Sequence, residues 1–226
     1  MTEFANKVVL VTGAAGALGQ AVVEHFATRG AKLAQLDVVE IDNGHYSATC
    51  DLTDTTSTTS AVANVVAELG TIDVLANIAG GFKMGEAVHE TTAETWDFLM
   101  GLNAESVLNM ARAVVPQMLT QGGGKIVNIG AGAGLSGTPQ MGAYSASKSV
   151  VIRLTEAMAG ELRAQNINVN CILPSIIDTP RNRADMPDAD FSSWVTPAAM
   201  AEVVGFLASD AAAPIHGAAL PVTGLS

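Results

Sequence analysis

Basic side chains are scarce in this sequence, and acidic side chains far outnumber them. The 226 residues include 11 Lys plus Arg against 22 Asp plus Glu, which gives a formal net charge of -11. Proteins that bind nucleic acid or anionic membrane surfaces draw much of their affinity from basic patches. We therefore predict no nucleic acid and no membrane among the partners, and we expect a small-molecule substrate instead.

Long apolar runs are also missing. No run reaches the length of about 18 residues that a membrane-spanning helix requires. The segment Met1 to Lys7 lacks the basic and then apolar order of a signal peptide. We therefore expect a cytoplasmic protein.

Cysteine is nearly absent, with only Cys50 and Cys171 in the chain. Both lie in or beside apolar runs that resemble strands, and their spacing fits neither a zinc site nor a disulfide framework. We expect two buried thiols and no metal.

Hydrophobic residues are abundant, at 49% of the chain, enough to fill a large core. Short β-branched runs alternate with helical stretches, which is typical of a doubly wound parallel sheet with helices on both faces. We predict one α/β, Rossmann-like domain over 1–226, with a cofactor half at about 1–130 and a catalytic half at about 131–226. Seven mainly parallel strands are expected at 7–12, 32–36, 46–50, 72–76, 125–129, 167–173 and 218–222.

Helices are expected between these strands. Asp54 can cap a helix that runs to Leu69, and the stretch 92–116 has the apolar spacing of two helices that meet near Asn103. The segment 176–194 has little periodicity and suits an irregular covering loop. The remaining helices are expected at 20–29, 144–165 and 197–209.

A glycine-rich turn follows the first strand and opens the first helix. It reads Gly13-Ala14-Ala15-Gly16-Ala17-Leu18-Gly19, an order that lets backbone N–H groups and the positive helix end meet a pyrophosphate. The alternative is a tight turn that binds no ligand. We place Gly13, Ala15, Ala17 and Leu18 among the candidate cofactor-binding residues.

Asp37 closes the second strand, eighteen residues after Gly19. A carboxylate at this place can accept hydrogen bonds from ribose hydroxyls and repels a 2′-phosphate, which favours NAD(H) over NADP(H). The alternative is an Asp that merely ends a strand.

Tyr144 and Lys148 are four residues apart at an expected helix start, so their side chains share one helical face. A Tyr has an ordinary pKa of about 10, and a nearby ammonium would lower that pKa and fit the phenol for proton exchange. Taken alone, a pair with this spacing is more often a solvated helix face than a catalytic pair.

Taken together and in this order, the motifs resemble the short-chain dehydrogenase/reductase family over essentially the whole chain. The matching segments are Thr12-Gly13 with Gly19, Asp51-Leu52, Asn77-Ile78-Ala79-Gly80, Asn103, Tyr144 with Lys148, and Pro174-Ser175-Ile176-Ile177-Asp178-Thr179. The resemblance implies an NAD(P)-dependent oxidoreductase that is a homodimer or homotetramer. It assigns proton exchange to Tyr144, support of that step to Lys148, and a proton-relay water to Asn103. Besides the turn residues and Asp37, it places the following at the cofactor: Asp51, Leu52, Asn77, Ala79, Gly80, Tyr144, Lys148, Pro174, Ile177 and Thr179.

Two positions depart from the family pattern. The usual second glycine of the turn would fall at Ala17, while Gly16 stands one place earlier. Thirteen residues before Tyr144, where the family has a Ser that donates to a substrate carbonyl, the chain has Ala131. A methyl group cannot donate that hydrogen bond.

Within the family, some segments are similar to dihydropteridine reductases, which also lack this Ser. They are Gly137-Thr138-Pro139, Asp178-Thr179-Pro180 and Met186 to Trp194. The sequence therefore supports hydride transfer between NAD(H) and a small carbonyl or alcohol substrate. The alternatives are a quinonoid dihydropteridine reductase and a non-catalytic NAD-binding regulator.

Overall fold

The computed structural model describes residues 3–226 and contains one seven-stranded sheet in which all neighbouring strands are parallel. The strand order is β3-β2-β1-β4-β5-β6-β7. The strands are β1 (Val8–Thr12), β2 (Lys32–Asp37), β3 (Tyr46–Thr49), β4 (Val74–Asn77), β5 (Gly124–Ile129), β6 (Ile167–Pro174) and β7 (Ala219–Val222). The predicted single-domain, doubly wound α/β fold is therefore confirmed.

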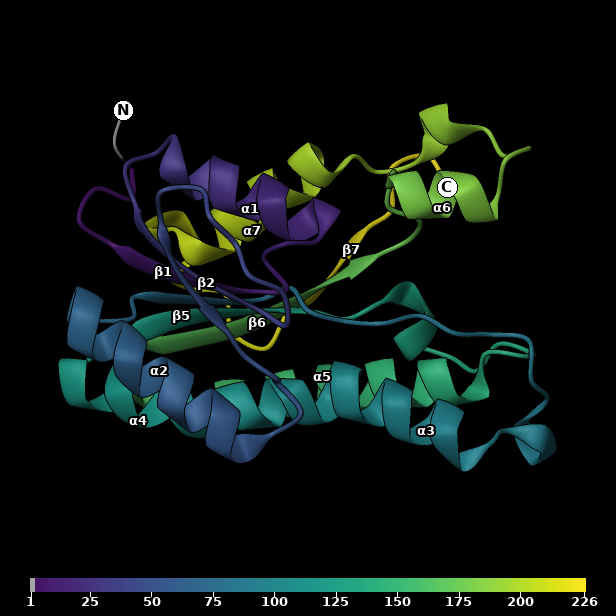
Figure 1. Ribbon diagram of the computed structural model, residues 1–226, viewed down its shortest axis with the longest axis horizontal. Helices are drawn as coiled ribbons and strands as arrows, with labels where there is room; N and C mark the ends of the chain where they lie inside the picture. The colour runs from purple at the N-terminus through teal and green to yellow at the C-terminus, as the bar shows by residue number, and fades with distance from the viewer. Residues whose placement is uncertain (1–2) are drawn as a thin grey trace.

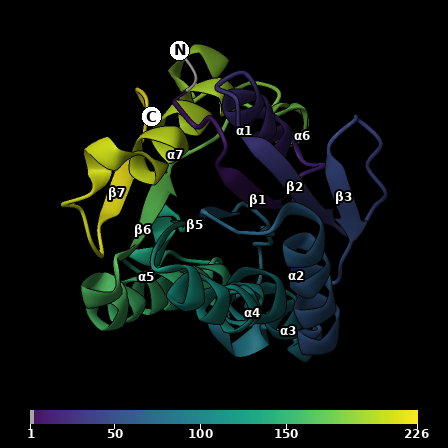
Figure 2. The same cartoon turned by 90° about the vertical axis from the view of Figure 1, so that its left-hand side faces the viewer.

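Helices cover both faces of the sheet, as Figures 1 and 2 show. One face carries α1 (Ala17–Ala27) and α7 (Pro197–Ala208), and the other carries α2 (Thr55–Leu69), α4 (Ser106–Gln121) and α5 (Gly142–Leu162). Two shorter helices, α3 (Ala93–Met100) and α6 (Pro180–Asp185), lie beyond the carboxyl ends of the strands. Single turns occur at 88–90, 101–105, 132–134, 163–165, 191–193 and 210–212.

The residues of strand β1 form a nearly continuous apolar run because both faces of the strand are buried. Val9 and Val11 pack into the core beneath α1 and α7, while Leu10 packs into the core on the side of α2 and α4. Successive side chains of a strand point to opposite faces, and here both faces are covered. A polar residue on either face would lie in one of the two cores.

The site edge of the sheet is fixed where the strand order reverses, between β1 and β4. The hydroxyl of Thr12 accepts hydrogen bonds from the N–H groups of Ile78 and Ala79, at 3.1 and 3.3 Å. Gly13 follows with φ +64°, and a Cβ on it would lie 2.7 Å from the Ala79 Cα. Only glycine lets these two turns meet, and the switch point is where open α/β sheets bind ligands.

The local signals located most helix ends correctly. The Asp54 side chain accepts hydrogen bonds from the Thr56 and Ser57 N–H groups, which confirms the predicted cap of α2. Two expectations were wrong. Helix α4 continues through Pro116 to Gln121, and the segment 176–194 contains α6, which the Thr179 side chain caps and Pro180 begins. The Thr-Pro pair is a start signal that the lack of periodicity concealed.

The structure also confirms the prediction for the cysteines, since Cys50 and Cys171 are both free and buried. Within residues 3–226, no helix is long and apolar enough to cross a membrane.

Candidate active site

The glycine-rich turn leaves a positive helix end open. Gly16 is extended and offers no side-chain cap to α1, and the first turn of α1 contains no acidic residue. The N–H groups of Ala17 and Leu18 therefore find no acceptor within their own helix. A Cβ on Gly19 would lie 2.1 Å from the Gly13 carbonyl oxygen, so the turn packs directly on the helix. These features suit a bound phosphate.

Asp37 lies next to this turn, as the sequence predicts. Its Oδ2 accepts a hydrogen bond from the Ala15 N–H at 2.9 Å, and Oδ1 accepts one from the Val39 N–H at 3.3 Å. Each carboxylate oxygen retains a further lone pair for a ribose hydroxyl. Val38 and Val39 are 66% and 52% exposed and offer apolar surface beside the carboxylate.

Asp51 and Leu52 follow β3, and their backbone is held by Asn109, a residue that the sequence prediction missed. Hydrogen bonds from the Thr53 hydroxyl and N–H lower the pKa of the Asp51 carboxyl. The buried Asn109 amide donates to the Leu52 carbonyl at 3.0 Å and to the Thr53 carbonyl at 3.3 Å. An Asn in the apolar stretch six residues after Asn103 was the signal, because a buried amide needs partners.

Asn103 lies in the π-helical turn 101–105 that joins α3 to α4, which confirms the predicted meeting of two helices. Its Oδ1 accepts from the Gly81 N–H at 2.8 Å. Its Nδ2 donates to the Gly81 carbonyl and to the Ser147 hydroxyl, both at 3.0 Å. The amide thereby holds the segment after Gly80 against α5, and π-helical turns frequently mark functional sites.

Ser147 completes this link and was not among the predicted site residues. It is fully buried, and its hydroxyl donates to the Tyr144 carbonyl at 2.8 Å. Its place three residues after Tyr144, on the same helical face, was the available signal. Asn103 and Ser147 together connect the Gly81 peptide to the backbone of Tyr144.

Lys148 is buried, and its Nζ donates to the Ile129 carbonyl at 2.9 Å. Burial lowers the pKa of Lys148 to about 8, against a smaller raising effect of the nearby Cys171. A pKa of about 8 leaves most of this amine protonated at neutral pH. A Cβ on Gly80 would lie 3.0 Å from the Asn103 Oδ1 and 3.3 Å from this Nζ, so Gly80 lets both side chains come close to the turn.

Tyr144 is half-buried in the first turn of α5. Its ring contacts Phe82, with centroids 4.9 Å apart and planes at 88°. Burial raises the pKa of Tyr144 to about 12, so the expectation that Lys148 lowers it was wrong. The Lys148 ammonium donates its hydrogen bond to the Ile129 carbonyl. The pKa of the Tyr144 phenol is therefore set by its removal from water, which disfavours the charged phenolate. At neutral pH the hydroxyl keeps its proton.

The position of the missing Ser is occupied by the buried methyl group of Ala131, which is 5% exposed. The segment that follows β6 starts close to Ala131, because a Cβ on the neighbouring Gly132 would lie 3.9 Å from the Pro174 carbonyl oxygen. Pro174 ends β6, Ile177 pairs with Val195, and Thr179 caps α6. The structure thus brings residues from both halves of the chain to one edge of the sheet.

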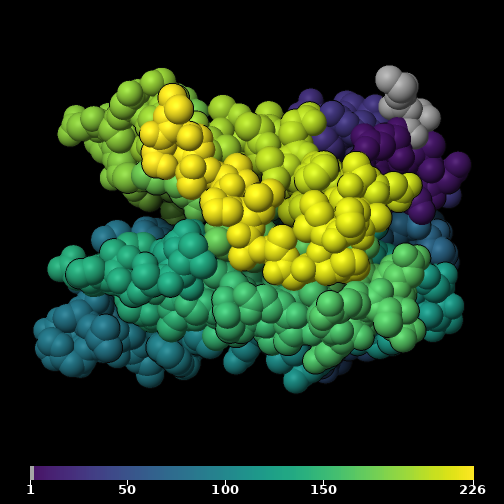
Figure 3. All heavy atoms as spheres, turned by 180° about the vertical axis from the view of Figure 1, so that it is seen from behind, coloured from purple at the N-terminus to yellow at the C-terminus, as the bar shows by residue number. Residues whose placement is uncertain are grey.

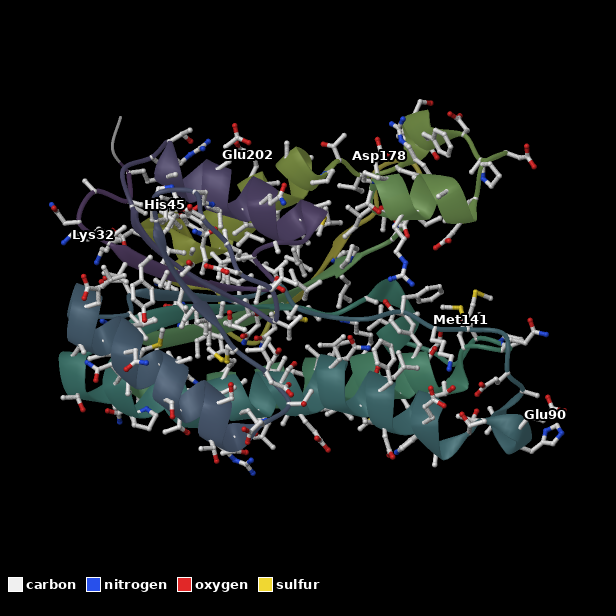
Figure 4. All side chains as sticks on the ribbon, in the orientation of Figure 1. Lys32, His45, Glu90, Met141, Asp178 and Glu202 are labelled. Carbon is white, nitrogen blue, oxygen red and sulfur yellow. The ribbon has the colours of Figure 1, made fainter. Side chains whose placement is uncertain are left out.

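A hollow separates the α6 segment, which we define as residues 179–193, from the layer that carries α5, as the space-filling view shows (Figure 3). In Figure 4, Asp178 and Met141 lie on its two sides. The base of the α6 segment is fixed, because the Asp178 N–H donates to the Val195 carbonyl at 2.8 Å and Trp194 is buried. Farther out, the Arg183 guanidinium pairs with Asp178 and stacks over Phe191 at 4.8 Å.

Elsewhere in the molecule, we searched for a second pocket and for a metal site. A hollow of about 450 Å³ lies at the amino ends of the strands, lined by Lys7, Asp73 and Lys125 among others, at the edge opposite Tyr144. Across residues 3–226, no three His, Cys, Asp or Glu side chains gather in a way that could hold a metal ion.

Comparison with known proteins identifies the family. Residues 7–190 match the model for short chain dehydrogenases, so the chain belongs to the short-chain dehydrogenase/reductase family. It is 35% identical to D-threitol dehydrogenase of Mycolicibacterium smegmatis, over 97% of this chain and 92% of that protein. It is 32% identical to the 3-oxoacyl-acyl-carrier-protein reductase FabG of Thermotoga maritima, over 97% of both chains.

A solved structure shares the fold. Carveol dehydrogenase from Mycobacterium avium, in complex with NAD, superposes with a TM-score of 0.89 at 27% identity, covering 99% of this chain and 98% of that one. As a member of this family, the protein is an oxidoreductase of the nicotinamide-dependent type.

Proposed function

We propose that this protein transfers hydride between NAD(H) and a small carbonyl or alcohol substrate, with Tyr144 exchanging the proton. The observation that carries the proposal is the assembly at one sheet edge of an open glycine-rich helix start with Tyr144, Lys148 and Asn103. Each part has a defined task in that reaction, and no metal is required for it.

The residues present fit a dinucleotide. The open N–H groups at the start of α1 would meet the pyrophosphate, Asp37 would receive the ribose hydroxyls, and Asp51 with Leu52 would lie along the adenine. When bound, the nicotinamide ring supplies or takes up the hydride. The segment that contains Pro174, Ile177 and Thr179 would border the ring at the carboxyl end of β6.

The proton is the protein's own contribution. Tyr144 carries its proton at neutral pH, because its pKa is raised to about 12, and this suits it to act as the acid in reduction. The buried Lys148 ammonium would bind the nicotinamide ribose and stabilise a phenolate as it forms. Asn103 holds the turn at Gly81 in place and would anchor a water chain that returns the proton.

Reduction of a quinonoid dihydropterin is the second candidate, and Ala131 favours it. Such a ring accepts hydride and a proton on nitrogen, so Tyr144 could suffice without a hydroxyl that binds a carbonyl oxygen. A resemblance of the segment from Met186 to Trp194 to that branch, inferred from the sequence alone, is a second reason to test this candidate. A carbonyl substrate, in contrast, must be held without the usual second donor.

Steady-state oxidation of NADH with a panel of ketones, vicinal dicarbonyls and quinonoid dihydropterin tests these alternatives. Turnover of a carbonyl supports the proposal, and turnover of the pterin alone supports the second candidate. Tight NADH binding with no turnover on any member would instead favour a non-catalytic NAD-binding regulator.

Asp37→Asn is expected to erase a preference for NADH over NADPH. Asp37 lies beside the turn that would hold the ribose, and a like charge at close range opposes a 2′-phosphate by roughly 1 to 3 kcal/mol. The amide keeps the acceptor for the Ala15 N–H without the charge. Fluorescence titration of both cofactors measures the effect, with Asp42→Asn as a nearby exposed control. Equal affinities in the unaltered protein would show that Asp37 plays no part in selection.

The α6 segment, 179–193, is expected to close when NADH binds. Its two ends are joined to each other by the bridge between Ile177 and Val195, and Met186 between them is 36% exposed. Segments tied at both ends and exposed between them often cover bound ligands. Hydrogen exchange with and without NADH measures this. Slower exchange across 179–193 on binding is expected, and unchanged exchange would mean that the segment is a fixed wall.

A further inference from the structure

Phe82 contacts Tyr144, but it has no task in the reaction proposed above. It follows the turn Ala79-Gly80-Gly81 and is 43% exposed, yet its ring stands edge to face against the Tyr144 ring at 4.9 Å. A large apolar side chain with this exposure at the mouth of a site has one surface free for a ligand. The question is whether the ring is held firmly enough to select one.

The backbone before Phe82 is fixed by hydrogen bonds to buried side chains. The N–H of Gly81 donates to the Asn103 Oδ1, and the C=O of Gly81 accepts from the Asn103 Nδ2. The same Nδ2 donates to the Ser147 hydroxyl, which donates to the Tyr144 carbonyl. A Cβ on Gly81 would lie 2.8 Å from the Phe98 ring. The backbone that bears Phe82 and the backbone that bears Tyr144 are therefore positioned by one buried chain of hydrogen bonds.

The residues after Phe82 are fixed by a second set of hydrogen bonds, to α3 and to the segment before α5. The Lys83 ammonium donates to the buried Thr95 hydroxyl at 2.7 Å, and that hydroxyl donates to the Glu86 carboxylate at 2.9 Å. The Gly85 N–H donates to the Gln140 carbonyl at 2.9 Å. Anchors on both sides make Phe82 a preorganised wall, which is the requirement for a residue that selects a ligand by shape.

The substrate needs such a wall, because Ala131 provides no hydrogen bond to its oxygen. We propose that Phe82 is a specificity-determining residue: its exposed face holds a flat, conjugated ring while the Tyr144 hydroxyl meets the reacting atom, so that flat substrates are preferred to bulky ones. The inference rests on the proposed function and narrows its substrate class. Offset stacking on an aromatic face is the contact that such a ring can make and a caged hydrocarbon cannot.

A matched pair of vicinal dicarbonyls tests this, with isatin as the flat probe and camphorquinone as the caged one. Phe82→Leu keeps apolar bulk and removes the flat face, and is expected to raise KM for isatin about 3- to 10-fold. The change in kcat should be smaller, and KM for camphorquinone should stay unchanged. Phe206→Ala, which removes an exposed ring on α7, should alter neither. A loss of kcat shared equally by both probes would mean that Phe82 only supports the fold, and would overturn the inference.

Calorimetry separates this inference from the proposed reaction. Isatin is titrated into the complex of the enzyme with NAD⁺, in which no reduction can occur. Binding that weakens about 3- to 10-fold in Phe82→Leu supports the role of Phe82 even if wild-type enzyme reduces neither probe. Equal affinity in the two proteins, or no isatin binding to the wild type, would overturn it whatever the turnover.

Discussion

Tyr144→Phe is expected to lower kcat by about 10² to 10⁴-fold, while the affinity for NADH changes less than about three-fold. The variant removes only the hydroxyl that carries the proton and retains the ring that packs against Phe82. The fold and the cofactor cradle should therefore be preserved. Single-turnover kinetics for the rate and fluorescence titration for NADH measure the two quantities separately.

The chain offers a close control for this variant. Tyr46 on β3 is the only other tyrosine, and Tyr46→Phe should leave both quantities unchanged. If Tyr144→Phe keeps more than about half of the wild-type rate in a reaction limited by chemistry, the proton comes from another group. The mechanism proposed above would then be wrong.

Gly19→Ala is expected to damage stability and cofactor binding together. The added methyl carbon would lie 2.1 Å from the Gly13 carbonyl oxygen and 2.7 Å from the Ala14 Cα, so the turn must move away from α1. Overpacking of this kind costs about 1 to 3 kcal/mol, which corresponds to roughly 3 to 10 °C in Tm for a chain of this size. The displaced turn should also lower NADH affinity by at least about tenfold.

Gly16→Ala is the matched control for this stability effect. Its Cβ would meet only the Gly13 carbonyl oxygen, at 3.4 Å, and its φ of -70° suits any residue. Tm should remain within about 2 °C of the wild type. Equal thermal shifts in the two variants would show that the Gly19 contact is not what fixes the turn. Differential scanning calorimetry provides this comparison.

The arrangement of the fold could be predicted because the signals for it are local and repeated. The apolar run of β1 requires burial on both faces, Asp54 caps α2, and the glycine-rich turn follows the first strand directly. Each signal depends on a few neighbouring residues. The length of α4 was missed because the surrounding structure tolerates Pro116, which local propensity alone would treat as an end.

The contacts within the site depend on tertiary structure, and the sequence could not predict them. The spacing of Tyr144 and Lys148 correctly indicated a shared face, but it could not show that the Lys148 ammonium bonds to the Ile129 carbonyl. The raised pKa of Tyr144 likewise comes from burial. The contact between Phe82 and Tyr144 joins residues far apart in the chain, and no spacing rule covers it.

Transfer of deuterium from NADH labelled at C4 tests the central claim most directly. The cofactor is prepared with deuterium on each face of C4 separately and incubated with the protein and the carbonyl members of the panel, and the products are examined by mass spectrometry. Direct hydride transfer predicts that the reduced carbon carries deuterium from one of the two labelled cofactors and not from the other, and that Tyr144→Phe forms this product far more slowly. Reduced product without deuterium from either cofactor, or no product from any member of the panel, would contradict the account.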